Sequence, residues 1–411
     1  MEQKTMKAAV LKGQGLESIA VEEVPLPVPA ERQLLARVDA AGVCTSILKL
    51  AAQGERHSFM EGWDPARWPI ILGDEGSLTV VEVGRGLAHR YTPGMRLGLQ
   101  PAVVGSPINH LERYRDQGRY MEKTAVGYTL GGCLAQYLLV PEEVIEGQCL
   151  LRLPDEDIPH YAVSMCEPIS CAISAQYRHI HLGKNHPTDP WTPHQGILGG
   201  GVCVVIGAGT MGRINLELAM RYRPGTIVAV DPVPNQLEWV RKNLATKART
   251  LGIDLVTCSP NETTAIVEER SGGRMASDVI VAVGKRSVQE EAVRLAGRGG
   301  VVNLFGGLPG GDSMLQVDAL RVHYDEMRLV GSSGGDPFDL QEALISVSRG
   351  DIEAGRYVAA VGSLDALPEA LRLMRDGRMP GRTIIYPHLE GIPLRHVHGW
   401  SADEERKLTS Q

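Results

Sequence analysis

A cysteine and an acidic turn in the first part of the chain are residue types that can hold a metal ion. Cys44 follows an apolar run, and Asp74 and Glu75 lie in a Gly-Asp-Glu-Gly turn between two apolar runs. Zinc accepts thiolate and carboxylate ligands, and a catalytic zinc site keeps one position open for water or substrate. The pattern indicates half of a metal site. A cysteine packed in a β domain is the alternative interpretation of Cys44 alone.

A second candidate site is the glycine-rich stretch "VCVVIGAGTMG". It places Gly207, Gly209 and Gly212 directly after an apolar run and at the start of a helical pattern. In a dinucleotide-binding turn the first glycine permits the tight turn, the second lets the backbone approach a pyrophosphate, and the third allows close helix–sheet packing. Thr210 and Met211 complete the predicted phosphate loop. A glycine turn in an α/β domain without a nucleotide is the alternative.

The following strand, "TIVAVD", ends in Asp231, at the spacing where a carboxylate binds the ribose hydroxyls of the cofactor. An acid there repels a 2′-phosphate, and the next residues, Pro232 and Val233, supply no arginine to hold one. The sequence therefore favours NAD over NADP. Val283 and Phe305 follow two further apolar strands, at the edge where an open α/β sheet binds its ligand.

These candidates require two kinds of architecture to position them. Residues 1–160 are short β-branched and leucine-rich runs broken by Gly and Pro, which predicts an irregular β domain. Residues 161–344 alternate apolar strands with amphipathic helices, which predicts a doubly wound domain with a parallel sheet. We expect residues 345–390 to return to the first domain, residues 183–200 to be a Pro- and Gly-rich loop insertion, and the polar tail 391–411 to be poorly ordered.

Composition excludes several classes of function. The net charge of −7 gives no basic surface for nucleic acid, and no apolar run is long enough to span a bilayer. The seven cysteines form no CxxC pair, which argues against a disulfide framework and against a cysteine-rich structural zinc site. The start of the chain lacks the order of a signal peptide. We therefore expect a cytoplasmic protein that acts on a small molecule.

The order of these features resembles the zinc-type medium-chain dehydrogenase/reductases over about residues 6–388, with a GroES-like catalytic β domain and a Rossmann domain. The stretches "CTSILKLAAQGERH", "CEPISCAI", "GIDLV" and "VHYDEMRLVGSSGG" are similar to the branch of L-sorbose-1-phosphate reductases and related polyol dehydrogenases. The resemblance implies an NAD-dependent interconversion of a secondary alcohol and its ketone, assisted by zinc.

The resemblance also assigns roles to individual residues. It implies that Cys44, Asp74 and Glu167 are ligands of a catalytic zinc, with Glu75 beside them as a catalytic and metal-site residue. Because Glu167 precedes a proline at the start of a helical pattern, its carboxylate is expected at the helix start. The resemblance further implies that the Ser46 hydroxyl touches the substrate oxygen, that Lys49 belongs to the proton relay, and that Arg382 contacts the cofactor pyrophosphate.

Asp74 departs from the family, which has histidine before this glutamate. As a ligand it would bring the negative charges of the set to three and weaken the Lewis acidity of the metal. If it does not bind, the site has lost its metal, and the protein would be a zinc-free reductase of an enone or quinone, or a non-catalytic NAD-binding protein. The cysteines of the family's second, structural zinc are missing between residues 95 and 130.

The sequence and the resemblance also indicate a class of substrate and an oligomeric state. We expect a polyol or sugar, and a phosphorylated one would require cations near the site. Arg56 and His57 could supply them, as could the loop that carries Arg113, Arg115 and Arg119. The stretch "VHYDEMRLVGSSGG" predicts an edge strand of the second domain, and the resemblance implies that such edges pair into homodimers or homotetramers.

Overall fold

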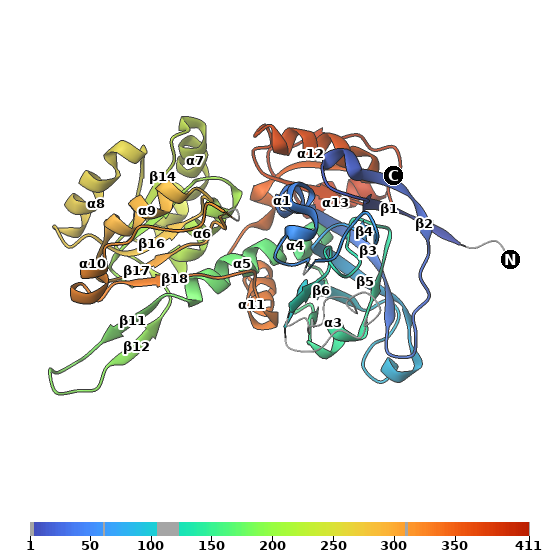
Figure 1. Ribbon diagram of the computed structural model, residues 1–411, viewed down its shortest axis with the longest axis horizontal. Helices are drawn as coiled ribbons and strands as arrows, with labels where there is room; N and C mark the ends of the chain where they lie inside the picture. Colours follow the sequence, from blue (N-terminus) through green and yellow to red (C-terminus); the bar gives the residue numbers. More distant parts are fainter. Residues whose placement is uncertain (1–3, 61, 105–122, 309–310, 411) are drawn as a thin grey trace. The chain divides into compact units, whose positions relative to one another are not determined.

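The computed structural model describes residues 4–60, 62–104, 123–308 and 311–410 (Figure 1). The chain forms two compact units: residues 1–170 with 335–411 make unit 1, and residues 171–334 make unit 2. The boundaries predicted from the sequence, 160/161 and 344/345, lie ten residues from these positions on either side. Arg113, Arg115 and Arg119 lie outside the described residues.

Unit 1 is the irregular β domain. Its largest sheet has the order β10-β6-β5-β3-β20-β19-β21 with β9 also paired to β3, and a smaller sheet has the order β2-β1-β4. The strands of this unit are β1 (Thr5–Leu11), β2 (Ile19–Pro25), β3 (Leu34–Val43), β4 (Ile70–Ile71), β5 (Glu75–Val83), β6 (Arg96–Leu99), β7 (Ala102–Val104), β8 (Lys123–Ala125), β9 (Tyr137–Val140), β10 (Leu150–Arg152), β19 (Val358–Gly362), β20 (Arg382–Ile385) and β21 (Arg395–His396).

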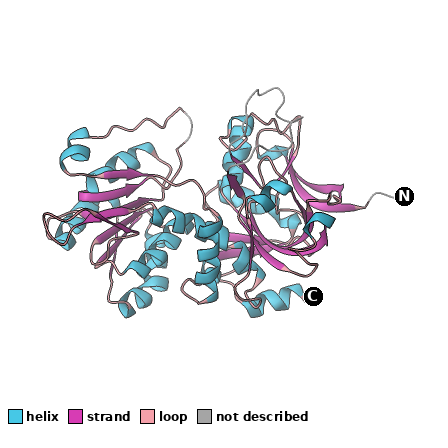
Figure 2. Ribbon diagram, turned by 90° about the horizontal axis from the view of Figure 1, so that it is seen from below, coloured by secondary structure: helices cyan, strands magenta, loops and turns pink. Residues whose placement is uncertain are grey.

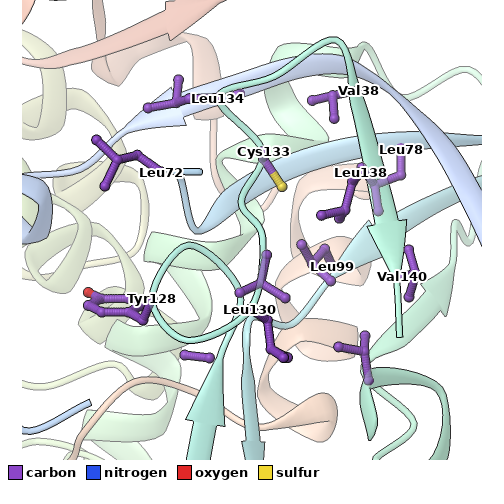
Figure 3. Close-up of a cluster of buried hydrophobic side chains, with 14 of the residues drawn as sticks. Val38, Leu72, Leu78, Leu99, Tyr128, Leu130, Cys133, Leu134, Leu138 and Val140 are labelled. Atoms are coloured by element: carbon purple, nitrogen blue, oxygen red, sulfur yellow. The ribbon is translucent and has the colours of Figure 1, made fainter. Parts of the chain in front are cut away.

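The helices of unit 1 surround this sheet. They are α1 (Ser46–Gln53), α3 (Glu142–Glu146), α4 (His160–Ser164), α11 (Pro337–Ser348), α12 (Leu367–Arg375) and α13 (Ala402–Thr409), while α5 (Cys166–Tyr177) runs from unit 1 into unit 2. Figure 3 shows part of the core, where Val38 of β3 and Leu78 of β5 are register partners and pack with Leu99 of β6. This core fixes the strand ends that carry the metal-site candidates.

Unit 2 contains the predicted parallel sheet, in the order β15-β14-β13-β16-β17-β18. Its strands are β11 (Ile180–Gly183), β12 (Thr192–Gln195), β13 (Val202–Ile206), β14 (Thr226–Val230), β15 (Asp254–Cys258), β16 (Ala276–Val281), β17 (Ala296–Asn303) and β18 (Arg328–Val330). Its helices are α6 (Thr210–Ala219), α7 (Pro234–Thr250), α8 (Thr263–Ser271), α9 (Arg286–Leu295) and α10 (Ala319–Tyr324). No helix in the described part of the chain is long and apolar enough to cross a membrane.

Helices cover both faces of this sheet (Figure 2). Alternate residues of β13 point to opposite faces. Cys203 and Val205 pack with α6 and α7, whereas Val202 and Val204 pack with α8 and α9. Burial on both faces explains why these strands are continuous apolar runs, and the predicted fold class, an α/β protein with a β domain and a doubly wound domain, is confirmed.

The predicted loop insertion at 183–200 was wrong in part, because β12 pairs with β11 in an antiparallel hairpin (Figure 1). The base of the hairpin is fixed by Asp278 of β16, which accepts hydrogen bonds from His179 Nδ1 at 2.7 Å and His181 Nε2 at 2.8 Å. The backbone N–H of Leu198 donates to the second oxygen of Asp278 at 3.0 Å. A buried carboxylate with these three donors holds the hairpin on the sheet.

Asp278→Asn is expected to lower the free energy of unfolding by about 2–3 kcal/mol, because hydrogen bonds to a charged group are worth roughly 1.5–3 kcal/mol. Burial alone would raise the pKa of Asp278, but its hydrogen bonds to His179 and His181 outweigh burial and hold the pKa below its usual range. The stability that Asp278 contributes is therefore fully present above its pKa in the unfolded chain, about 3.9, and is lost as the pH falls through its lower pKa in the folded protein. Urea unfolding at pH 7 and pH 3 checks this: wild type and variant should differ less at pH 3.

The expectation of a poorly ordered tail was wrong. Helix α13 begins at a capping box of Ser401 and Glu404. Glu405 is buried and accepts hydrogen bonds from the backbone N–H groups of His160 and Tyr161, each at 2.8 Å, and from the Tyr386 hydroxyl at 2.9 Å. The tail therefore belongs to unit 1 and stabilises the start of α4.

Candidate active site

Three strand ends bring the metal-site candidates together in unit 1. Cys44 follows the last residue of β3, Glu75 is the first residue of β5, and Arg382 is the first residue of β20. Strand β3 pairs antiparallel with both neighbours, with Gly42 opposite Glu75 and also opposite Ile384. An antiparallel pair brings the end of one strand beside the start of the next, so residues far apart in the sequence meet here.

Cys44, Asp74 and Glu75 form a compact group of possible metal ligands. One ligand atom from each lies within 4.8 Å of the other two. The Glu75 carboxylate is buried over Gly42, where a Cβ atom would stand 1.8 Å from Glu75 Oε2, so only glycine leaves room for it. Arg382 Nη1 lies 3.2 Å from Glu75 Oε1, in a pair with both side chains buried.

The electrostatics of this group favour the neutral, protonated side chains in the absence of a bound cation. Burial, and then the Asp74 charge, raises the pKa of Cys44 to about 12. Burial also raises the pKa of Glu75 to about 7 despite the nearby Arg382, and raises the pKa of Asp74. Desolvation disfavours the charged form of each acid. The thiolate and carboxylates that a metal needs are therefore stabilised here only when a positive charge joins them.

The residues fit a divalent metal. Asp74 Oδ1 and Glu75 Oε2 are buried and have no hydrogen-bond partner among the described residues, which leaves both oxygens available as ligands. Cys44, Asp74 and Glu75 can carry three negative charges against the single guanidinium of Arg382, and a divalent cation would balance the excess. Zinc accepts this set of sulfur and oxygen donors.

Helix α1 places the predicted relay residues. Ser46 is its first residue, and its hydroxyl donates to Asp74 Oδ2 at 3.2 Å. Lys49 is exposed on α1, and its charge, after burial, lowers the pKa of His57. The structure thus brings Ser46 to the metal cluster and places Lys49 one turn further along the helix, so its part in the relay stays a prediction.

Glu167 and Arg382 differ in how they relate to the cluster. Glu167 is buried in the first turn of α5 and lies outside the group of three ligand atoms, although its charge contributes to the raised pKa of Cys44. Arg382 is buried at Glu75, and its Nη1 also donates to the Val43 carbonyl at 3.4 Å. Their predicted roles, as third ligand and as pyrophosphate contact, stay predictions.

Tyr128 is a site residue that the sequence did not reveal. It is 5% exposed, and its hydroxyl interacts with Asp74 and Ser46. Burial, and then the Asp74 charge, raises the pKa of Tyr128. Its ring lies 5.3 Å from that of His57 and 5.2 Å from that of Phe59, centroid to centroid. Only the glycine-flanked stretch "VGYTLGG" marks a turn here, and nothing in it indicates a partner for the tyrosine.

The phosphate loop of unit 2 has the geometry predicted from its glycines. Gly207 has φ +97°, where an L side chain is strained. A Cβ at Gly212 would stand 1.7 Å from the Gly207 carbonyl oxygen, whereas a Cβ at Gly209 would meet no atom within 4 Å. The N-terminus of α6 has no side-chain cap and begins at Thr210, followed by Met211. Open space before an uncapped helix start fits a pyrophosphate.

A cavity of about 440 Å³ continues from this loop along the ends of β13 and β14. Gly207, Asp231 and Val283 line it, and Phe305 is half-buried against the core on the α6 face. Asp231 accepts hydrogen bonds from the backbone N–H groups of Ala208 at 2.7 Å and Val233 at 2.8 Å. These bonds fix the carboxylate at the cavity wall, where ribose hydroxyls can donate to its remaining lone pairs.

Asp231→Ser is expected to weaken NAD binding by about 10–100-fold, because two hydroxyl groups would lose a charged acceptor worth roughly 1.5–3 kcal/mol. NADP binding should weaken less or improve, since the repulsion of its 2′-phosphate is removed. Fluorescence titration with NADH and NADPH measures both dissociation constants. Equal weakening of both cofactors would show that Asp231 acts only through the loop backbone.

Together the two units define a metal-assisted, dinucleotide-dependent oxidoreductase. Residues 30–154 match the family described as alcohol dehydrogenase GroES-like domain, and residues 211–349 match the family described as zinc-binding dehydrogenase. The chain belongs to the zinc-type medium-chain alcohol and polyol dehydrogenases, and it is an enzyme of that class. The predicted family, with its use of zinc and a nicotinamide dinucleotide, is confirmed at this level.

Curated relatives match nearly the whole chain. The mannitol-1-phosphate 5-dehydrogenase of Aliivibrio fischeri is 28% identical over 409 residues, which cover 97% of this chain and 90% of the relative. The L-sorbose 1-phosphate reductase of Klebsiella pneumoniae is 26% identical over 414 residues, which cover 96% of this chain and 95% of the relative.

A solved structure supports the fold. The 2R,3R-butanediol dehydrogenase of Bacillus subtilis superposes with a TM-score of 0.72 at 21% identity, over 93% of this chain and all of that one. At this identity the likeness shows the fold alone, with the same combination of β domain and parallel-sheet domain.

Proposed function

We propose that the substrate of this NAD-dependent polyol dehydrogenase is a phosphorylated polyol, or the ketose phosphate in the reverse direction. The observation that carries the proposal is that relatives aligned over more than nine-tenths of the chain are named for mannitol 1-phosphate and L-sorbose 1-phosphate. Exposed Lys49 and Arg56 support it, because they lie in α1 and just after it, the helix that begins at the metal cluster. Phosphate recognition requires such cations.

The protein side of the reaction follows from unit 1. Cys44, Asp74 and Glu75 would hold the zinc, with Glu167 as a further candidate ligand. Bound zinc would supply Lewis acidity toward the substrate oxygen, and NAD would accept the hydride. The Ser46 hydroxyl, at the first position of α1, would take up the proton that leaves the alcohol while it passes its own proton on, through a relay that includes Lys49, to solvent. Lys49 lies three residues on and so shares a face of the helix, where it assists as an acid–base group or hydrogen-bond donor.

Matched substrates test the proposal. NADH formation from mannitol 1-phosphate and from arabitol phosphate is compared with that from mannitol and arabitol, and NADH oxidation by sorbose 1-phosphate with that by sorbose. We expect kcat/KM to be at least about 10-fold higher for the phosphorylated member of each pair, since one charge-assisted hydrogen bond is worth roughly 1.5–3 kcal/mol. Equal or higher values for the unphosphorylated members would overturn it.

We also propose a homodimer or homotetramer that forms through the edge strand β18. Within the described residues β18 pairs only with β17, and several exposed apolar side chains lie in β18 or in the segment that precedes it in the chain: Met314, Leu320, Val322, Tyr324 and Leu329. An open strand edge with apolar neighbours is suited to pairing with a second copy. Light scattering after size exclusion should give two or four times the 44.5 kDa chain mass, and a monomer would remove the proposal.

A cytoplasmic location is proposed as well. All seven cysteines are free thiols, which is typical of a reducing compartment. Fractionation of the source cells, with immunodetection of the protein in the cytoplasmic fraction and in the oxidising compartments, tests the proposal, and enrichment in an oxidising compartment would contradict it.

A further inference from the structure

The turn that carries Tyr128 is built against the turn that carries Asp74. Gly127 has φ +82°, and a Cβ there would stand 2.6 Å from the Gly73 carbonyl oxygen. Gly73 in turn has φ +102°, and its carbonyl accepts a hydrogen bond from the backbone N–H of Cys133 at 2.8 Å. Two glycines with positive φ thus let two backbones touch, one residue before Asp74 and one residue before Tyr128.

The tyrosine side chain is fixed in this place. Its backbone N–H donates to the Ala125 carbonyl at 3.2 Å, which closes the turn. Its ring packs against the rings of His57 and Phe59, and the hydrophobic cluster of unit 1 includes Tyr128 (Figure 3). The hydroxyl therefore has little freedom, and it interacts with Asp74 and with Ser46.

Asp74 has two oxygens in different situations. Oδ2 accepts the hydrogen bond of Ser46, whereas buried Oδ1 has no hydrogen-bond partner among the described residues. A carboxylate that binds a metal through one oxygen needs the other held by hydrogen bonds, which orient it and tune its donor strength.

We propose that Tyr128, together with Ser46, is a positioning residue for Asp74, which makes this aspartate workable as a metal ligand. The hydroxyl groups hold the carboxylate so that Oδ1 faces the metal. The inference rests on the ligand role of Asp74 in the function proposed above. It assigns no proton transfer to Tyr128.

The test measures zinc affinity by competition with a chromogenic chelator, on the full chain stripped of metal and reloaded with zinc alone. Tyr128→Phe removes only the hydroxyl and should weaken zinc binding by about 10–100-fold, the usual effect of losing a residue that orients a metal ligand. Tyr91→Phe, another buried tyrosine of unit 1, is the matched control and should bind zinc like wild type. Wild-type zinc affinity in Tyr128→Phe would overturn the inference.

Adding Tyr128→Phe to the Asp74→His variant separates an effect on the Asp74 carboxylate from a general structural effect of losing the tyrosine hydroxyl. In Asp74→His the carboxylate is gone, so Tyr128→Phe should change zinc affinity by less than about 3-fold if the two residues act together. The same loss in both backgrounds would contradict the proposal. Gly127→Ala keeps the hydroxyl but forces the turn away from Gly73, and it should weaken zinc binding as well; unchanged affinity would count against the proposal.

The zinc affinities of wild type and Tyr128→Phe also separate a failure of the proposed metal site from a failure of the role proposed for Tyr128. Wild-type protein that takes up no zinc would overturn the ligand role of Asp74 and the inference with it. Wild-type protein that takes up zinc, beside a Tyr128→Phe variant with unchanged affinity, would overturn the inference alone.

Discussion

Replacing Cys44 by alanine is expected to remove bound zinc and to lower kcat/KM by about 1,000-fold. The thiolate is the softest donor of the cluster, and its loss leaves only the two carboxylates at the start of β5, Asp74 and Glu75, from the group of three ligands. Lewis-acid assistance is worth several kcal/mol, and about 4 kcal/mol corresponds to a factor of about 1,000. The variant should still bind NADH, because the dinucleotide site lies in unit 2.

Steady-state kinetics and metal analysis of the same samples check this prediction. Cys149→Ala is the matched control, since Cys149 is also buried in unit 1 but is not part of the ligand group. It should keep its zinc and an activity within about 2-fold of wild type. A Cys44→Ala variant with wild-type turnover would show that the thiolate has no part in the chemistry.

Arg382→Met is expected to destabilise the metal-free protein by about 3–5 kcal/mol at about pH 9, where the Glu75 carboxylate, whose pKa is raised to about 7, is ionised in the wild type. Removal of one partner from a buried ion pair leaves the other charge uncompensated, and such changes typically cost this much. Here the remaining partner is Glu75, with Asp74 and Cys44 beside it. Burial would lower the pKa of Arg382, but the charge of Glu75, followed by that of Cys44, keeps it above its usual range. The guanidinium is therefore the main counter-charge of this cluster.

Urea unfolding with and without zinc measures the effect. The loss should be smaller in the zinc-loaded protein, because the cation replaces part of the missing charge. Arg375→Met serves as the control: Arg375 pairs with Asp376 on the surface, and its replacement should change the free energy of unfolding by less than about 0.5 kcal/mol. Equal stability of Arg382→Met and wild type would mean that Glu75 is protonated in the folded protein.

The fold was predictable because its signals are local. Strands buried on both faces give continuous apolar runs, and a glycine at each required position of the phosphate loop leaves a readable spacing. The site in unit 1 depends instead on strand register. No sequence pattern predicts that Gly42 lies opposite Glu75 in the strand register. Nor does one predict that Arg382 donates a hydrogen bond to the Val43 carbonyl, which lies 339 positions earlier in the chain. Cys44, Asp74 and Glu75 could be grouped only through resemblance to a family.

Other features have no signal in the sequence, or have a signal that also fits a different structure. Strand β12 is fully exposed and contains a proline, so it shows no apolar alternation. Tyr128 is placed by backbone contact between two glycine turns, which no periodicity reveals. The tail carried the Ser-x-x-Glu pattern of a capping box, but its helix buries few side chains, chiefly Glu405 and Leu408, and so resembles a solvated segment.

The most direct test is a zinc titration of metal-stripped protein in which bound zinc and NAD-dependent oxidation of mannitol 1-phosphate are followed together. We expect turnover to rise in proportion to bound zinc and to reach its maximum at one zinc per chain. Full turnover in the stripped protein, or zinc uptake that leaves turnover unchanged, would contradict a metal-assisted dehydrogenase built on Cys44, Asp74 and Glu75.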